Sequence, residues 1–111
     1  MAFQNIVGYK LGQATAPTSY FTLYTVPANT RTYVKDLDIC NTTAGSLRFY
    51  IHLVPAGKSA DTSNALFYNA PINANSTVQW TGSAIMNAGD TIQIKASATG
   101  CVIGATGGEA T

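Results

Sequence analysis

Short extended segments, each followed by a turn, divide this sequence at regular intervals. The segments are rich in Tyr, Phe, Val, Ile and Thr, and the turns in Gly, Pro, Asn or Ala. The segments are Phe21–Val26, Tyr33–Cys40, Leu47–Val54, Val78–Trp80 and Ile92–Ala96. Short strands at this spacing are typical of antiparallel sandwiches and barrels. We therefore predict an all-β fold: a single antiparallel β-sandwich, jelly-roll or immunoglobulin-like, with about seven or eight short strands.

The clearest strand is Leu47–Val54, in which apolar and polar side chains alternate. Side chains two residues apart share one face of a strand. The predicted core face consists of Leu47, Phe49, Ile51 and Leu53, and the opposite face of Arg48, Tyr50 and His52. The second face combines a charge, an aromatic ring and a titratable group, as contact surfaces between subunits often do. Arg48, Tyr50 and His52 are therefore the candidate subunit interface.

Two local irregularities are predicted. The apolar side chains of Tyr33–Cys40 do not keep a single phase, and a β-bulge near Lys35-Asp36 would restore the register. A short helical turn is expected within Ala60–Leu66, where Asp61 or Ser63 is suited to cap it. Helix is disfavoured elsewhere, because the sequence is rich in β-branched residues and has a single Glu.

The 111 residues suffice for one domain with a modest core. We assign residues 1–111 to a single β-sandwich domain, with an extended N-terminal arm at residues 1–5 and a C-terminal tail at residues 106–111. The tail is not expected to order itself, because it holds too little apolar surface. The first five residues have neither a basic head nor an apolar signal core. No run approaches the ~20 apolar residues of a membrane span.

Charge is scarce: charged residues make up 10% of the sequence and the net charge is +1. This is well under half the usual ~25%. A surface without a basic patch is not expected to bind nucleic acid or an anionic membrane. A weakly charged surface rich in Thr, Ala and Tyr suits a protein that neighbouring subunits cover, and a neutral secreted binding module is the main alternative.

No catalytic set emerges from the sequence. His52 is the only histidine and lies in the middle of a predicted strand. A nucleophilic mechanism needs a nucleophile, a base and an orienting group, and nothing near His52 supplies them. With one His and two distant Cys, zinc ligation is not expected. We therefore expect neither enzymatic activity nor a cofactor.

Two residue pairs leave alternatives open. Cys40 and Cys101 are expected to be buried free thiols, although a disulfide between them stays open. Asp36 and Asp38 share one face of a strand and supply either half of a Ca²⁺ site or a solvated or salt-bridged pair.

Aromatic residues are numerous for this length. Exposed Tyr and Trp side chains anchor protein contacts or stack on sugars. Tyr50 is the best contact candidate, because it alternates outward beside His52. Trp80 shares its phase with Val78 and is expected on the core side.

The order of the segments resembles a known class of small proteins. Leu23–Thr30 precedes a strand that ends at Cys40-Asn41-Thr42, and then come Arg48–Val54, Pro55-Ala56-Gly57, Pro71–Asn75, Asn87–Ile92 and a late glycine-containing strand. This order, over roughly residues 11–105, resembles the small β-sandwich structural proteins in the virion modules of tailed bacteriophages. The resemblance rests on the order of the motifs more than on any single motif.

The resemblance implies a non-enzymatic virion component, made in the cytoplasm of the host bacterium and built into the particle. We expect a capsid decoration or cement protein that forms a homotrimer of cyclic symmetry. Its partners would be copies of itself and other virion proteins, such as the major capsid protein. The alternatives are a tail or neck accessory protein, a receptor- or carbohydrate-binding module, and a cellular β-sandwich adaptor.

Overall fold

The structure, a computed structural model, describes residues 6–111, so the expected arm over residues 1–5 lies outside the described residues. The described part contains eight strands and one 3₁₀ turn. They are β1 (Ile6–Thr15), β2 (Phe21–Thr25), β3 (Arg31–Asn41), β4 (Leu47–Val54), η1 (Thr62–Asn64), β5 (Ala65–Ile72), β6 (Thr77–Met86), β7 (Thr91–Ala96) and β8 (Cys101–Ala110).

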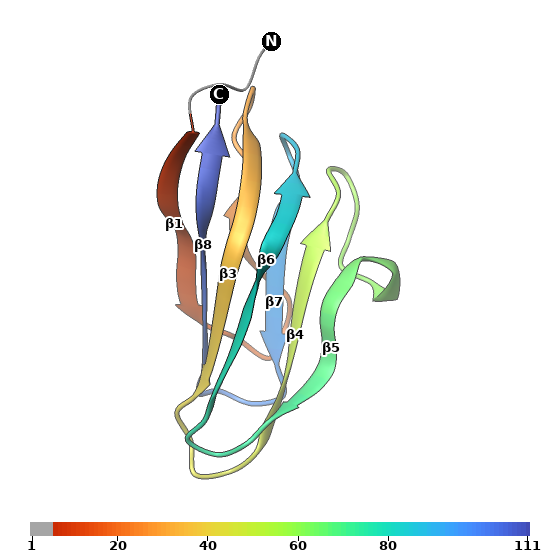
Figure 1. The fold of residues 1–111 in the computed structure, drawn as a ribbon. Helices are drawn as coiled ribbons and strands as arrows, with labels where there is room; N and C mark the ends of the chain where they lie inside the picture. The colour runs from red at the N-terminus through yellow and green to blue at the C-terminus, as the bar shows by residue number, and fades with distance from the viewer. Residues whose placement is uncertain (1–5) are drawn as a thin grey trace.

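The strands form two four-stranded sheets packed face to face (Figure 1). Their orders are β1-β8-β3-β6 and β2-β7-β4-β5, and every pairing is antiparallel. Successive strands therefore alternate between sheets except at β4–β5, the arrangement of a jelly roll with two Greek keys. The predicted β-sandwich is confirmed, and the topology selects the jelly-roll form over the immunoglobulin form.

The core lies between the sheets and is built from alternate residues of each strand. On β4, Leu47, Phe49 and Ile51 are buried as predicted, and Leu53 is half-buried. The opposite sheet contributes fully buried side chains such as Leu37 and Ile39 of β3. Each buried side chain of this size stabilises the fold by about 1.5–3 kcal/mol, so this alternation determines the register of the strands.

A line of bulges crosses the sheet β1-β8-β3-β6. The register shifts at Leu11 of β1 and at Lys35 of β3, and β6 places two residues, Gly82 and Ser83, opposite the single residue Lys35. The shifts in β1 and β3 both lie beside Thr106 of β8, and the irregularity in β6 lies beside Lys35 of β3. The bulge predicted near Lys35-Asp36 is confirmed. Bulges at one level increase the twist of the whole sheet there.

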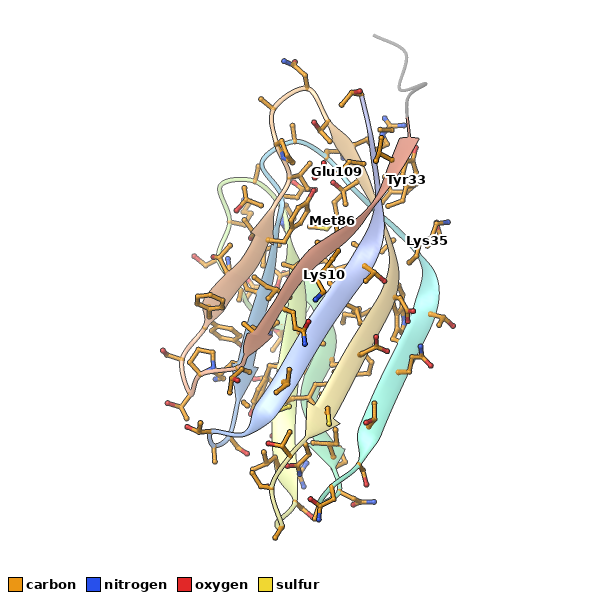
Figure 2. All side chains as sticks on the ribbon, turned by 90° about the vertical axis from the view of Figure 1, so that its left-hand side faces the viewer. Lys10, Tyr33, Lys35, Met86 and Glu109 are labelled. Carbon is orange, nitrogen blue, oxygen red and sulfur yellow. The ribbon has the colours of Figure 1, made fainter. Side chains whose placement is uncertain are left out.

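The segment expected to be a tail is instead part of a central strand. β8 continues to Ala110 and pairs with β1 on one side and with β3 on the other (Figure 2). Near its end, Glu109 accepts a hydrogen bond from the Tyr24 hydroxyl, which lies 2.7 Å from the Thr32 hydroxyl. The expectation of a tail over residues 106–111 was wrong because backbone pairing on both sides, rather than apolar side chains, orders this glycine-rich segment.

Close backbone approach requires Gly107 to lack a side chain. A Cβ there would lie 2.0 Å from the backbone oxygen of Tyr33, whereas the nearest atom to a Cβ at Gly104 would be 3.8 Å away. The composition that suggested a flexible tail therefore lets β8 fit closely beside β3.

Alanine substitutions at the two glycines form a matched pair. We expect Gly107→Ala to lower the free energy of unfolding by about 3 kcal/mol, because the backbone of β3 must move. Gly104→Ala should change it by less than about 0.5 kcal/mol. Urea denaturation followed by tryptophan fluorescence measures both values. Equal stabilities of the two variants would contradict the position of β8.

Candidate functional site

The three residues of the candidate interface lie on β4 and face the outer side of the sheet β2-β7-β4-β5. They differ in accessibility: Arg48 is exposed, Tyr50 is half-buried and His52 is fully buried. Alternation along β4 placed all three on one face correctly, but it did not reveal that other residues cover part of that face. His52 therefore cannot be touched by a partner in this conformation, and the interface prediction stays open only for Arg48 and Tyr50.

A second layer of side chains covers His52. The ring of Tyr20, which precedes β2, meets the imidazole edge to face, with the centroids 4.9 Å apart. Tyr68 of β5 lies on another side, with a centroid distance of 6.2 Å. The turn η1, in the connection from β4 to β5, brings Asn64 to the same ring. As predicted, Asp61 caps this turn.

Hydrogen bonds determine the tautomer of His52. Asn64 Nδ2 donates to the Ser59 carbonyl (3.0 Å), and Asn64 Oδ1 accepts from the Asp61 backbone N–H (3.1 Å). The amide oxygen therefore faces His52 Nδ1, 2.8 Å away, and Nδ1 must be the donor. In the neutral imidazole Nε2 is then the acceptor, and the Tyr20 hydroxyl lies 2.9 Å from it. Both ring nitrogens are occupied, so neither is open to a substrate.

A cation lies between two of the tyrosines. Lys95 Nζ, from β7, is 4.6 Å from the ring centroid of Tyr20 and 4.4 Å from that of Tyr50. A cation at these distances is attracted to the faces of aromatic rings. Burial first, and then the neighbouring Tyr68 and Tyr50, raise the pKa of Tyr20 above its ordinary value of 10.0. The Tyr20 hydroxyl therefore stays protonated at neutral pH and donates a hydrogen bond to His52 Nε2.

Asn69 of β5 binds the other two residues of the candidate interface, Arg48 and Tyr50. Its backbone is in the left-handed region (φ 52°), where the strand is irregular. Its carbonyl accepts from Arg48 Nη1 (2.9 Å), and its side-chain oxygen accepts from the Tyr50 hydroxyl (3.0 Å). Asn tolerates this backbone conformation better than most residues. Reasoning from the sequence did not single out Asn69, since the residues that meet there are 19 or more positions apart.

The other predicted residues do not form a chemical site. Cys40 and Cys101 are free thiols. Cys40 is on the outer face of β3, whereas Cys101 is buried on the inner face of β8, so their side chains point to opposite sides of one sheet. Burial first, and the neighbouring Cys40 second, raise the pKa of Cys101 to about 11. The alternative of a disulfide is therefore excluded in this structure.

The carboxylates Asp36 and Asp38 both lie on the outer face of β3, as predicted. Gln79 Nε2 donates to Asp36 Oδ1 at 3.2 Å. Within residues 6–111, no group of three or more His, Cys, Asp or Glu side chains could hold a metal ion. The described part of the chain therefore offers no support for the Ca²⁺ alternative. Over the same residues, no helix has the length and apolar character needed to cross a membrane.

Comparison with known proteins yields only structural similarity. No protein-family model and no curated protein matches the sequence. A chain in the structure of infectious bursal disease virus Gx strain is 13% identical, with a TM-score of 0.49 and coverage of 96% of this chain and 32% of that one. A chain in the crystal structure of the T13 IBDV viral particle is 12% identical, with a TM-score of 0.50 and coverage of 96% and 30%.

This chain therefore spans about a third of the length of the chains it matches. At 12% identity, the likeness to the viral-particle chain concerns the fold alone. A fold similar to this one therefore forms about 30% of a chain in that viral particle.

Removal of the buried histidine should destabilise the fold. His52→Ala leaves a cavity and deprives Asn64 and Tyr20 of their partner, so we expect the free energy of unfolding to fall by about 2–4 kcal/mol. Arg48→Ala, on the same face of β4 but exposed, should cost less than about 1 kcal/mol. Urea denaturation measures both. If both variants lost a similarly small amount of unfolding free energy, that result would contradict the burial of His52 beneath a second layer of side chains.

The cap of η1 gives a pH prediction. The Ser63 hydroxyl first, and the Ser63 backbone N–H second, donate to the Asp61 carboxylate and lower its pKa below the ordinary 3.8. Because the pKa of Asp61 is lower in the folded than in the unfolded protein, the carboxylate contributes its full stabilisation of the fold above its pKa in the unfolded protein. This stabilisation is lost as the pH falls through the lower pKa that Asp61 has in the folded protein. We expect the difference in melting temperature between wild type and Asp61→Ala to shrink on acidification below pH 3.8. Calorimetry at several pH values measures this difference, and a difference that widens there would contradict the cap.

Proposed function

We propose that this chain is a non-enzymatic structural component of a virus particle, specifically a capsid decoration or cement protein of a tailed bacteriophage. The observation that carries the proposal is the jelly-roll topology, which a chain of a viral particle shares at a TM-score of 0.50. The order of the sequence segments, which resembles phage virion proteins, supports the phage assignment. The protein would be made in the cytoplasm of the host bacterium and reside in the virion.

The surface composition supports an assembled protein. With charged residues at 10% of the sequence, the surface lacks the mixed charges that usually keep a monomer soluble. Several large apolar or aromatic side chains are also exposed: Val7, Tyr20, Phe21, Tyr68 and Ile85. Neighbouring copies and the major capsid protein are the partners we propose, with a homotrimer of cyclic symmetry as the assembled unit.

Two observations favour a non-enzymatic role. Both nitrogens of His52 are engaged by Asn64 and Tyr20, and the ring is fully buried. The two thiols lie on opposite faces of a sheet, and neither neighbours His52 along the strands. Neither thiol is thus placed for His52 to act on it as a base.

The proposed contact surface is centred on Tyr68 and Arg48, two exposed members of the outer face described above. Tyr68 is 56% exposed, and its ring packs edge to face on Tyr50 at 5.3 Å. A rigid aromatic side chain of this kind is a common anchor of protein contacts. Tyr50 itself is less suited, because its ring supports Lys95 and its hydroxyl binds Asn69.

Substitution of Tyr68 tests this surface. Tyr68→Asp should weaken assembly at least about tenfold, because it places a charge in the centre of the contact. Tyr68→Phe, the matched control, should assemble like the wild type. Analytical ultracentrifugation gives the affinities, and melting temperatures verify that both variants are folded. Unchanged assembly of Tyr68→Asp would remove this face from the contact.

The location of the protein tests the function itself. Antibodies raised against the recombinant chain should label purified phage particles in electron micrographs, in a regular pattern over the capsid. Labelling confined to the neck or tail would replace the decoration role by that of an accessory protein. Absence of the chain from purified particles, with abundant chain in the lysate, would contradict the proposal.

A carbohydrate-binding module is the second candidate, favoured by the exposed ring of Tyr68. Sugars stack on the faces of such rings. However, Lys95 occupies a face of Tyr20 and of Tyr50, which leaves Tyr68 as the accessible platform in this cluster. Binding of the folded chain to a glycan array, lost in Tyr68→Ala, would favour this candidate.

A further inference from the structure

The four outermost strands of the two sheets are unequally protected against pairing with another strand. An unprotected sheet edge is a template for strand addition, and Lys, Pro, bulges or short length normally protect it. β1 carries Lys10 and a bulge at Leu11, β2 has only five residues and a register shift, and β5 has Pro71 and the left-handed Asn69. β6 differs from these three: it is ten residues long and contains neither proline nor a charged residue.

One half of β6 is regular and accessible. Thr77–Thr81 pairs residue by residue with Cys40–Asp36 of β3, and the register shift comes only after it, at Gly82-Ser83. Its other side is the open edge of the sheet (Figure 2). Thr77, Gln79 and Thr81 are exposed on the outer face.

The inner face of the same segment is incompletely covered. Val78 and Trp80 point toward the core, as predicted, yet both are only half-buried. The Trp80 ring is packed over Gly82, where an added Cβ would lie 2.9 Å from the indole. Part of each side chain therefore remains accessible, and a neighbouring strand would cover it.

The sequence of this segment is self-complementary. If a second copy lies antiparallel about a two-fold axis at Gln79, Thr77 faces Thr81 of that copy, Val78 faces Trp80, and Gln79 faces Gln79. Each of these is a favourable cross-strand combination: two hydroxyls, a β-branched residue with an aromatic one, and two amides. No charges of like sign meet, and a two-fold axis leaves both outer faces on the same side of the joined sheet.

We infer that the Thr77–Thr81 edge of β6 pairs with the same edge of a second copy and joins two sheets into one of eight strands. The inference deepens the proposed function: it rests on the proposed self-association and adds a two-fold contact to the three-fold contacts within the proposed homotrimer. This two-fold contact is separate from the face around Tyr68, so a particle can use both.

A cysteine at the axis tests the pairing. Gln79→Cys, made with Cys40→Ser, places two thiols opposite each other, while Cys101 stays buried and its raised pKa keeps it unreactive. The matched control is Gln13→Cys, since Gln13 is exposed, on the same outer face and in the same row of the sheet, but on the opposite edge. With an effective concentration of about 1 mM in the pair and about 10 μM protein, oxidation to the dimer should be roughly 100-fold faster for Gln79→Cys.

Equal rates for the two cysteine variants, or a monomeric Gln79→Cys, would overturn the inference. Hydrogen exchange of the wild type provides a second measurement: amides in Thr77–Thr81 should gain protection as the protein concentration rises. Constant exchange there, together with concentration-dependent protection around Tyr68, would overturn the β6 contact and leave the proposed function intact. A wild type that stays monomeric, with no change in exchange anywhere, would overturn both self-association and the β6 contact.

Discussion

The pairing of β8 between β1 and β3 is the constraint on which the fold depends. β8 is the last strand in sequence, yet it lies inside the sheet and bridges the first strand to the third. Gly107 permits this, because a Cβ there would lie 2.0 Å from the backbone oxygen of Tyr33 in β3. The chain therefore closes its sandwich with its final ten-residue strand, so the first four-stranded sheet cannot be complete until nearly the whole domain is present.

Side chains of Tyr20, Tyr68 and Asn64 cover part of the outer face of the second sheet, and they determine which residues of that face are accessible. The imidazole of His52 is enclosed by Tyr20 and by Asn64 of η1, so a residue with catalytic potential serves as a structural link between strand and turn. Lys95 is likewise held between two rings. What remains accessible around this cluster is a surface suited to contact, with Arg48 and Tyr68 exposed.

Features with local causes could be predicted from the sequence. The strand Leu47–Val54, the bulge at Lys35 and the turn capped by Asp61 each follow from spacing or capping within a few residues. The extension of β8 through Gly107 could not be predicted this way, because its order comes from strands remote in sequence. The burial of His52 was missed for the same reason, since Tyr20 is 32 residues away. The role of the left-handed Asn69, which accepts a hydrogen bond from Arg48, likewise depends on the pairing of β5 with β4.

The proposed self-association would account together for the sparse charge, the exposed rings and the open edge of β6. The molar mass of the purified chain, measured by light scattering during size exclusion over a wide concentration range, tests it most directly. We expect a closed oligomer whose mass is an integral multiple of the 11.6 kDa chain, reached at high concentration and stable thereafter. A mass of one chain at the highest soluble concentration would contradict a surface built for contact between copies.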